Sequence, residues 1–243
     1  MLRSNLAVGT DAVFLTLGIN QQFLVTRPGL SVRRDLAGAR LGLVGDGALG
    51  DILTLFLQRQ LAQEGIEGIE LVRISNDEEQ RLSVLHDGTC DGVILTPPVA
   101  IKARHAGCHF LSDLAEYGFN YALGGIGARR TYVDEHSDVA RRFVTAYVEG
   151  LHRYRTDREF TIDVQQRFSG LDDRGLAEET YDVTMPGMPR APHPVTTALA
   201  KALEIIALDL PAAASADPNQ FVEPRFVREL DESGFIARLY GDG

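Results

Sequence analysis

Residues 40–50, Arg-Leu-Gly-Leu-Val-Gly-Asp-Gly-Ala-Leu-Gly, decide the fold of this chain. Residues 40–44 form an apolar run typical of a strand that is buried on both faces, and a glycine turn follows at once. Beyond the turn, Ile52, Leu55 and Phe56 recur at the spacing that places side chains on one face of a helix. The stretch therefore predicts a buried strand, a tight turn and a helix of about four turns.

The same order of elements recurs downstream of this helix. Strand, helix and strand at this spacing are typical of right-handed βαβ units and of a parallel sheet. We therefore expect residues 35–116 to form one lobe on a parallel sheet. Its further predicted elements are strands at 69–74, 91–95 and 108–111, a helix near 77–86 and a short helix that opens at Pro97-Pro98.

The segments on either side of this lobe do not make a whole domain by themselves. Short strands are predicted at 7–17 and 21–26, and helices dominate after residue 128, one of which Ser137 could cap. We therefore expect a lobe one made of residues 1–34 and 117–243, into which residues 35–116 are inserted as lobe two. Two crossings, near 24–34 and 112–124, would serve as the hinge.

The composition indicates a globular protein and disfavours several partners. The chain has 243 residues, 44% of them hydrophobic, and a net charge of −10. An acidic surface repels phosphate backbones, so no nucleic acid partner is expected. No apolar run is long enough to span a bilayer, so the chain is not expected to be membrane-embedded. Cys90 and Cys108 lie in separate apolar neighbourhoods, which favours buried free thiols over a disulfide or a metal pair.

Residues 45–50 allow three interpretations. Gly45-Asp-Gly-Ala-Leu-Gly50 fits the dinucleotide pattern G-x-G-x-x-G, and Asp77 stands where that fold places its ribose acid. The glycines could instead only make a tight turn. The third interpretation is that N–H groups at the helix N-terminus form a cradle for a polar or anionic ligand group. No motif places a catalytic histidine, lysine or tyrosine, so no cofactor is expected.

Residues 35–51 resemble the start of the second lobe in ABC-transporter substrate-binding proteins of the nitrate/sulfonate/taurine class, which is similar to the thiamin-pyrimidine binding proteins. The resemblance implies a periplasmic-binding-protein-like fold of type II, with two α/β lobes, a cleft ligand and an ABC permease as partner. Further matching stretches follow in the family's order: Val25–Pro28, Leu85–Pro98, Tyr132–Phe143 and Pro224–Leu230.

Two departures from the family pattern affect these expectations. The family carries a signal sequence and further βαβ units ahead of the point that matches the start of this chain, so lobe one is expected to be incomplete and to self-associate through exposed strand edges. Asp11 also interrupts any signal-like stretch, which leaves a cytoplasmic location as the alternative to a periplasmic or cell-surface one. Ala48 and Gly50 stand where the family has serines, and Asp46 stands where proline is common, so a neutral or cationic ligand is as compatible as an anionic one.

The resemblance implies a set of ligand contacts in the glycine turn, in the loop after the third strand and at the hinge. Thr96 could instead cap its own helix, and Tyr121 could only pack. No metal site is expected, because His105 and His109 straddle Gly107, which breaks a helix. The expected ligand-binding residues are Gly45, Asp46, Gly47, Ala48, Leu49, Gly50, Thr96, Pro97, Pro98, Asn20 and Tyr121.

Three functions remain in competition. The first is a solute-binding component of an ABC import system, which performs no chemistry on its small-molecule ligand. The second is a cytoplasmic enzyme on the same fold, similar to pyrimidine synthases or decarboxylases. The third is a dinucleotide-dependent oxidoreductase. The sequence signals no nucleophile, acid–base pair or metal set, so the binding protein is the expectation and no catalytic residue is named.

Overall fold

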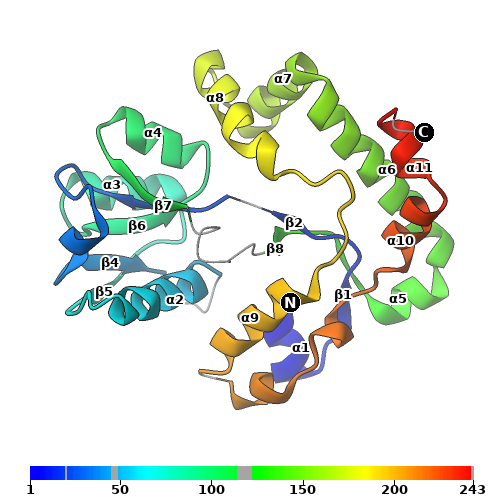
Figure 1. Ribbon diagram of the computed structural model, residues 1–243, viewed down its shortest axis with the longest axis horizontal. Helices are drawn as coiled ribbons and strands as arrows, with labels where there is room; N and C mark the ends of the chain where they lie inside the picture. Colours follow the sequence, from blue (N-terminus) through cyan, green and yellow to red (C-terminus); the bar gives the residue numbers. More distant parts are fainter. Residues whose placement is uncertain (20, 45–48, 114–121, 209, 242–243) are drawn as a thin grey trace. The chain divides into compact units, whose positions relative to one another are not determined.

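The computed structural model describes residues 1–19, 21–44, 49–113, 122–208 and 210–241. These residues divide into two compact units (Figure 1). Unit 1 comprises Met1–Asn20, Asn120–Arg174 and Thr184–Gly243, and unit 2 comprises Gln21–Phe119 and Gly175–Val183. The chain therefore passes between the units four times, and the first passage precedes the expected hinge at 24–34.

Unit 2 is built on one five-stranded sheet in the order β5-β4-β6-β3-β7. β4 is parallel to β5 and to β6, as the βαβ spacing predicted. β3 is antiparallel to both β6 and β7, so the expected all-parallel sheet is wrong and the sheet is mixed. The strands are β3 (Phe23–Thr26), β4 (Arg40–Leu43), β5 (Glu70–Arg73), β6 (Gly92–Leu95) and β7 (His109–Asp113).

β3 explains why the units divide near residue 20 and not near residue 34. All four of its residues are buried, and it hydrogen-bonds to neighbours on both sides, with Phe23 opposite Leu95 and Asp113. A strand held between two others cannot leave its sheet without exposing the N–H and C=O groups of its ladder. Residues 21–34, which the sequence placed with lobe one, therefore belong to the body of unit 2.

Helices cover both faces of the unit 2 sheet (Figure 1). On one face, Phe23, Val25 and Val93 pack with Leu85 of α3 and with Ala100 of α4. The alternate residues of the same strands are buried too, as is expected for a sheet covered on both faces. The helices of unit 2 are η1 (Arg33–Leu36), α2 (Leu49–Gln63), α3 (Glu78–His86), α4 (Val99–His105) and most of α8 (Arg174–Thr184).

Unit 1 is mainly helical, with two short ribbons, β1-β9 and β2-β8. Its core joins Val13 of β1 with Val133 of α5, Val144 of α6 and Phe226 of α10. The elements of unit 1 are α1 (Leu2–Val8), β1 (Ala12–Phe14), β2 (Gly18–Ile19), β8 (Ala122–Gly124), β9 (Gly127–Arg129), α5 (Arg130–Glu135), α6 (Ser137–Thr156), α7 (Arg158–Ser169), η3 (Met185–Gly187), α9 (Thr196–Ile206), η4 (Pro211–Ser215), η5 (Pro218–Phe221), α10 (Arg225–Glu232) and α11 (Phe235–Leu239).

Two local predictions in unit 1 were wrong. The expected strand at 7–17 begins only at Ala12, because residues 2–8 form a helix that Gly9 ends in the left-handed conformation, with φ of 70°. Ser137 does not cap α6: His136 occupies the N-cap position, and no side chain makes the capping bond there.

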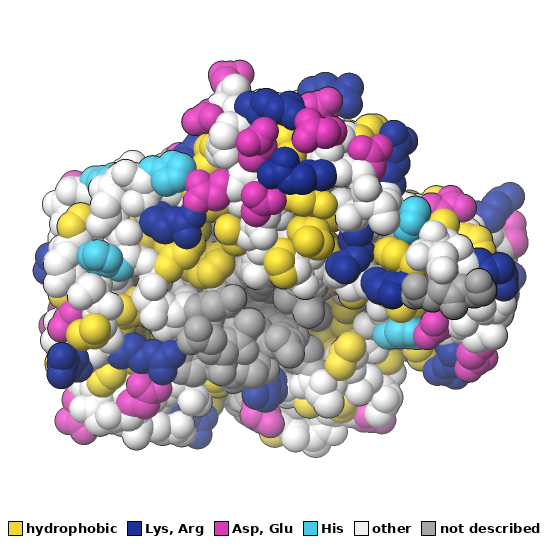
Figure 2. Space-filling view, turned by 45° about the horizontal axis from the view of Figure 1, so that its top comes forward, with side chains coloured by type: hydrophobic (Ala, Val, Ile, Leu, Met, Phe, Trp, Pro, Cys, Tyr) yellow, Lys and Arg dark blue, Asp and Glu magenta, His cyan; other side chains and the backbone are white. Residues whose placement is uncertain are grey.

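The charged side chains of the described surface are mixed in sign. On the face that Figure 2 shows, acidic and basic groups lie among one another. Pairs such as Arg174 with Glu159 and Asp163 place opposite charges in contact on neighbouring helices. Among the described residues, no helix is both long enough and apolar enough to cross a membrane.

Candidate functional site

The candidate site lies at the carboxyl edge of the parallel strands of unit 2. β4, β5 and β6 run in the same direction, so Leu43, Arg73 and Leu95 end at this edge. β3 runs the other way, so Gln21 and Gln22 precede it at the same edge, next to the Phe23–Leu95 pair. Loops at the carboxyl ends of strands are where open α/β sheets bind ligands.

The structure describes part of the predicted site. Leu49 and Gly50 open α2, and Thr96, Pro97 and Pro98 connect β6 to α4 with a cis peptide bond between the two prolines. Gly45, Asp46, Gly47, Ala48, Asn20 and Tyr121 lie outside the described residues. Whether the glycine turn contacts a ligand therefore remains a prediction.

Thr96 is held by Glu78, the first residue of α3. The backbone N–H of Thr96 donates to Glu78 Oε2 at 3.2 Å, and its hydroxyl lies 3.0 Å from Oε1 and 2.9 Å from Oε2. The alternative that Thr96 caps its own helix is wrong, because Pro98 is the N-cap residue of α4 and no side chain caps it. Both donors of Thr96 are thus bound to a carboxylate of the protein itself.

The buried side chain of Arg81 holds the same edge together through hydrogen bonds. Its side chain is only 9% exposed, and it lies 4.0 Å from Glu78 Oε1. Its guanidinium donates to the carbonyl oxygens of Ser75, Asn76 and Ile94, at 3.2, 2.9 and 3.2 Å. A buried guanidinium needs such acceptors because it carries five N–H donors and one charge. Arg81 therefore ties the ends of β5 and β6 to the start of α3.

Gln21 and Gln22 bring unpaired acceptors to this edge. The side-chain Oε1 atom of each is buried and has no hydrogen-bond partner among the described residues. Such atoms are rare in folded proteins, because each forfeits the hydrogen bonds that water gave it. Sequence reasoning missed all three residues, because Gln21 and Gln22 fell inside the predicted strand 21–26 and Glu78 lies in an acidic run at the start of a predicted helix.

Contacts in the structure bear on two other sequence interpretations, the ribose-binding role of Asp77 and a metal site at His105. Asp77 caps α3 by accepting the N–H of Gln80 at 3.0 Å, which accounts for an acid after β5 without a ribose. His105 lies 2.7 Å from Glu179 of α8, within unit 2. No group of three or more potential metal ligands occurs among the described residues.

Both cysteines of the chain are buried in the apolar core of unit 2. Burial raises the pKa of the Cys90 thiol and that of the Cys108 thiol. A thiol attacks carbon or sulfur as its thiolate, so neither cysteine has the exposure or the ionisation of a nucleophile.

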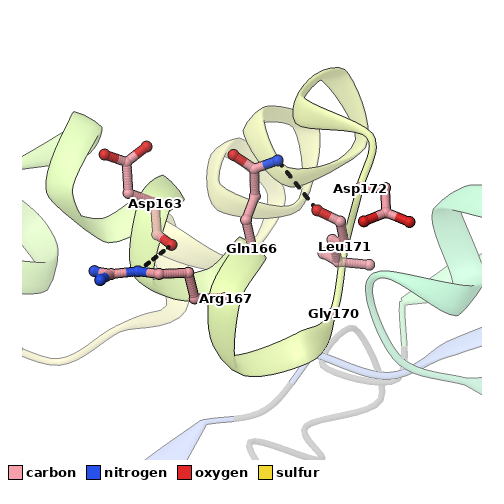
Figure 3. Close-up of a pocket in the computed structure, with 6 residues that line it drawn as sticks. All are labelled: Asp163, Gln166, Arg167, Gly170, Leu171 and Asp172. Carbon is pink, nitrogen blue, oxygen red and sulfur yellow. Dashed lines mark hydrogen bonds between the residues drawn. The ribbon is translucent and has the colours of Figure 1, made fainter.

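Unit 1 contains a separate open hollow of about 730 Å³ at the end of α7 (Figure 3). Gln166 Nε2 donates to the carbonyl of Leu171 at 3.1 Å, and Arg167 Nε donates to the carbonyl of Asp163 at 3.3 Å. Both bonds lie within the lining itself, and of the predicted ligand-binding residues that the structure describes, none lines the hollow. The lining residues are Asp163, Gln166, Arg167, Gly170, Leu171 and Asp172.

The fold of this chain is similar to that of solved substrate-binding proteins of ABC import systems. The chain is similar to the ligand-binding component of an ABC-type import system from Staphylococcus aureus, solved with zinc bound. The TM-score is 0.72 at 16% identity, over 91% of this chain and 75% of that chain. It is also similar to a periplasmic sulfonate-binding protein, SsuA, described as putative, from Methylobacillus flagellatus, with a TM-score of 0.69 at 19% identity, over 98% of this chain and 72% of that one. The resemblance to the sulfonate class is thereby confirmed at the level of the fold.

An enzyme shares the fold as well. The desulfurization enzyme DszB matches with a TM-score of 0.72 at 18% identity, over 96% of this chain and 82% of its own. No family model matches the chain, and no curated protein matches it in sequence. The fold alone therefore allows both a binding protein and an enzyme.

Proposed function

We propose that this protein is the solute-binding component of an ABC import system and that it binds one small polar molecule without changing it. The observation that carries the proposal is the likeness, over 91 to 98% of this chain, to ligand-binding proteins of such systems. The candidate site supports it, because the loop after β6 stands where α/β sheets bind ligands. The partner would be an ABC permease, and the location periplasmic or at the cell surface.

Thermal unfolding of the full chain against a library of small polar compounds tests this function. The library should hold amines, amidines, amides, pyrimidines, amino acids, sulfonates and inorganic oxyanions. A ligand that binds the native state alone stabilises it by RT ln(1 + [L]/Kd), which is about 2.7 kcal/mol at a hundredfold excess over Kd. We expect saturable stabilisation by one narrow chemical group. An unchanged melting temperature across every class would contradict the proposal.

An enzyme on the same fold is the second candidate, because the DszB match is as close as the match to a binding protein. A complex of DszB with biphenyl-2-sulfinic acid was solved with a variant in which a cysteine is replaced by serine. In the present chain, the burial of Cys90 and Cys108 disfavours cysteine chemistry. Incubation with biphenyl-2-sulfinic acid and assay for released sulfite distinguishes the two functions, and we expect no release.

Self-association would not depend on either function. β1 pairs with β9 along one side and bridges Val222 through Phe14. Neighbouring chain on both sides reduces the number of open N–H and C=O groups through which a second copy could pair. We therefore propose that any dimer forms through surfaces other than these strand edges. Light scattering over a range of concentrations would show whether a dimer forms.

A further inference from the structure

Both hydrogen-bond donors of Thr96 are occupied by Glu78. In a site for a sulfonate or another oxyanion, donors must face the ligand oxygens. Here the N–H and the hydroxyl of Thr96 both point at Glu78, whose side chain is 28% exposed. The carboxylate therefore takes up both Thr96 donors that an anionic ligand group would need, and it leaves acceptor capacity on its exposed side.

The nearby guanidinium of Arg81 does not make this edge an anion-binding site. Arg81 donates its N–H groups to backbone carbonyls and to Asn76 Oδ1, which accepts at 2.8 Å. Its side chain is 9% exposed, whereas that of Glu78 is 28% exposed. The carboxylate is therefore more accessible to a ligand at this edge than the guanidinium is.

The unpaired amide oxygens of Gln21 and Gln22 are an independent sign of the same preference. They precede β3 at the edge from which Thr96 leaves β6, as the pairing of Phe23 with Leu95 shows. A buried acceptor without a partner is costly, and a ligand that donates to it recovers that cost. The edge therefore combines a partly exposed carboxylate with two unused acceptors.

We infer that this edge, formed by Gln21, Gln22, Glu78 and Thr96, selects a ligand through a hydrogen-bond-donating group such as an ammonium, an amidinium or an amide, and discriminates against sulfonates. The inference rests on the proposed function and specifies the ligand class. A sulfonate would bring a second negative charge to Glu78 while finding both donors of Thr96 occupied, and such repulsion is how sites reject a wrong ligand.

Isothermal titration of the full chain with head-group series on a constant body tests the inference. One series is benzamidine, benzamide and benzenesulfonate, and the other is butylamine, butyramide and butane-1-sulfonate. Any compound that stabilised the protein in the library is tested alongside its own charged and neutral analogues. We expect the donor head group to bind at least about tenfold more tightly than the matched sulfonate.

Two variants with the same charge change locate the effect. Glu78→Gln should lower the affinity for the donor compound about tenfold or more and reduce the discrimination against the sulfonate. Glu79→Gln, one residue further along α3, removes a carboxylate that pairs with Lys102 at 2.5 Å and is 58% exposed, and it should change affinity by less than about twofold. If Glu78→Gln fails to fold by circular dichroism, Gln22→Leu provides the second test, with the same loss expected.

The outcomes separate the two proposals. Tighter binding of sulfonates or inorganic oxyanions than of donor compounds would overturn the inferred ligand class and leave the solute-binding function standing. Equal effects of Glu78→Gln and Glu79→Gln would also overturn the inference, because the carboxylate at Thr96 would then play no special part. Binding of no compound from any class would remove the proposed function, and the inference with it.

Discussion

Asp91 accepts a 2.7 Å hydrogen bond from Arg27 Nε, which fastens the end of β3 to the start of β6. Its other carboxylate oxygen accepts the backbone N–H of Arg40 at 2.8 Å and Arg40 Nε at 3.2 Å, so the start of β4 joins the same cluster. Asp91 belongs to the segment Leu85–Pro98 on which the sequence resemblance rests. The aspartate of that segment is therefore structural: it holds three strands at the edge opposite the candidate site.

The first prediction concerns acid stability. Burial opposes ionisation of Asp91, but the hydrogen bonds from Arg27 and Arg40 outweigh it and lower the pKa to about 2. An aspartate in an unfolded chain has a pKa of about 3.9, so Asp91 stabilises the fold above that pH, by about 2 kcal/mol. This stability is lost as the pH falls from about 4 towards 2.

The variant Asp91→Asn should therefore be less stable at pH 7 and should lose less stability than the wild type between pH 4 and pH 2. Urea unfolding at a series of pH values measures both effects. Asp138→Asn is the control, since Asp138 is 72% exposed and its pair with Arg142 should contribute well under about 1 kcal/mol. Parallel pH profiles for wild type and Asp91→Asn would count against this role of Asp91.

The second prediction concerns a glycine in unit 1. A Cβ atom at Gly125 would clash with the backbone carbonyl of Thr16 and would lie 3.1 Å from Leu17 Cδ2. Because backbone cannot yield as a flexible side chain can, Gly125→Ala should destabilise the protein by about 1–3 kcal/mol. Gly127→Ala makes no approach closer than 3.5 Å and should cost less. Similar midpoints of urea unfolding for the two variants would disprove the clash.

The third prediction links stability to binding at the candidate site. Gln22→Leu replaces an unpaired buried acceptor by an apolar group of similar size, so the ligand-free protein should become more stable, by up to about 1–3 kcal/mol. Ligand affinity should fall in the same variant, because function commonly retains such unfavourable groups. Gln63→Leu, at an exposed position of α2, should change neither property. A destabilised Gln22→Leu variant with unchanged affinity would make Gln22 a packing residue.

The fourth prediction concerns the cysteines. Cys90 is fully buried and Cys108 is 3% exposed, so a thiol reagent should react with the native protein only as fast as the protein opens. In urea, both thiols of each chain should react promptly. Absorbance of the aromatic disulfide reagent gives both rates. Fast reaction of one thiol in the native state would instead support the hypothesis of a cysteine-based enzyme.

The sequence predicts the core of unit 2 well because the signals there are local. β4, β5 and β6 are short apolar runs between turn residues, and α2 repeats its apolar positions at helical spacing. The direction of β3 is not local information: the run 23–26 looks the same whether it pairs parallel or antiparallel. The helix at 2–8 was missed because only Leu2 and Leu6 are large and apolar before Val8.

The candidate site was predicted in part for the same reason. Thr96-Pro97-Pro98 follows a strand that the pattern reveals, so its place at the carboxyl edge could be foreseen. Glu78 lies 18 residues from Thr96, in the acidic run Asp77-Glu78-Glu79, and nothing local separates the residue that binds Thr96 from its exposed neighbours. The unpaired oxygens of Gln21 and Gln22 arise only once the units have folded.

Calorimetric titration followed by mass spectrometry tests the central proposal most directly. The compound that stabilises the chain in the library is titrated into the full chain, and the bound molecule is then recovered and weighed. We predict one molecule bound per chain and a recovered compound of unchanged mass. Recovery of a chemically altered compound would identify an enzyme, and failure to saturate with any compound would contradict a solute-binding protein.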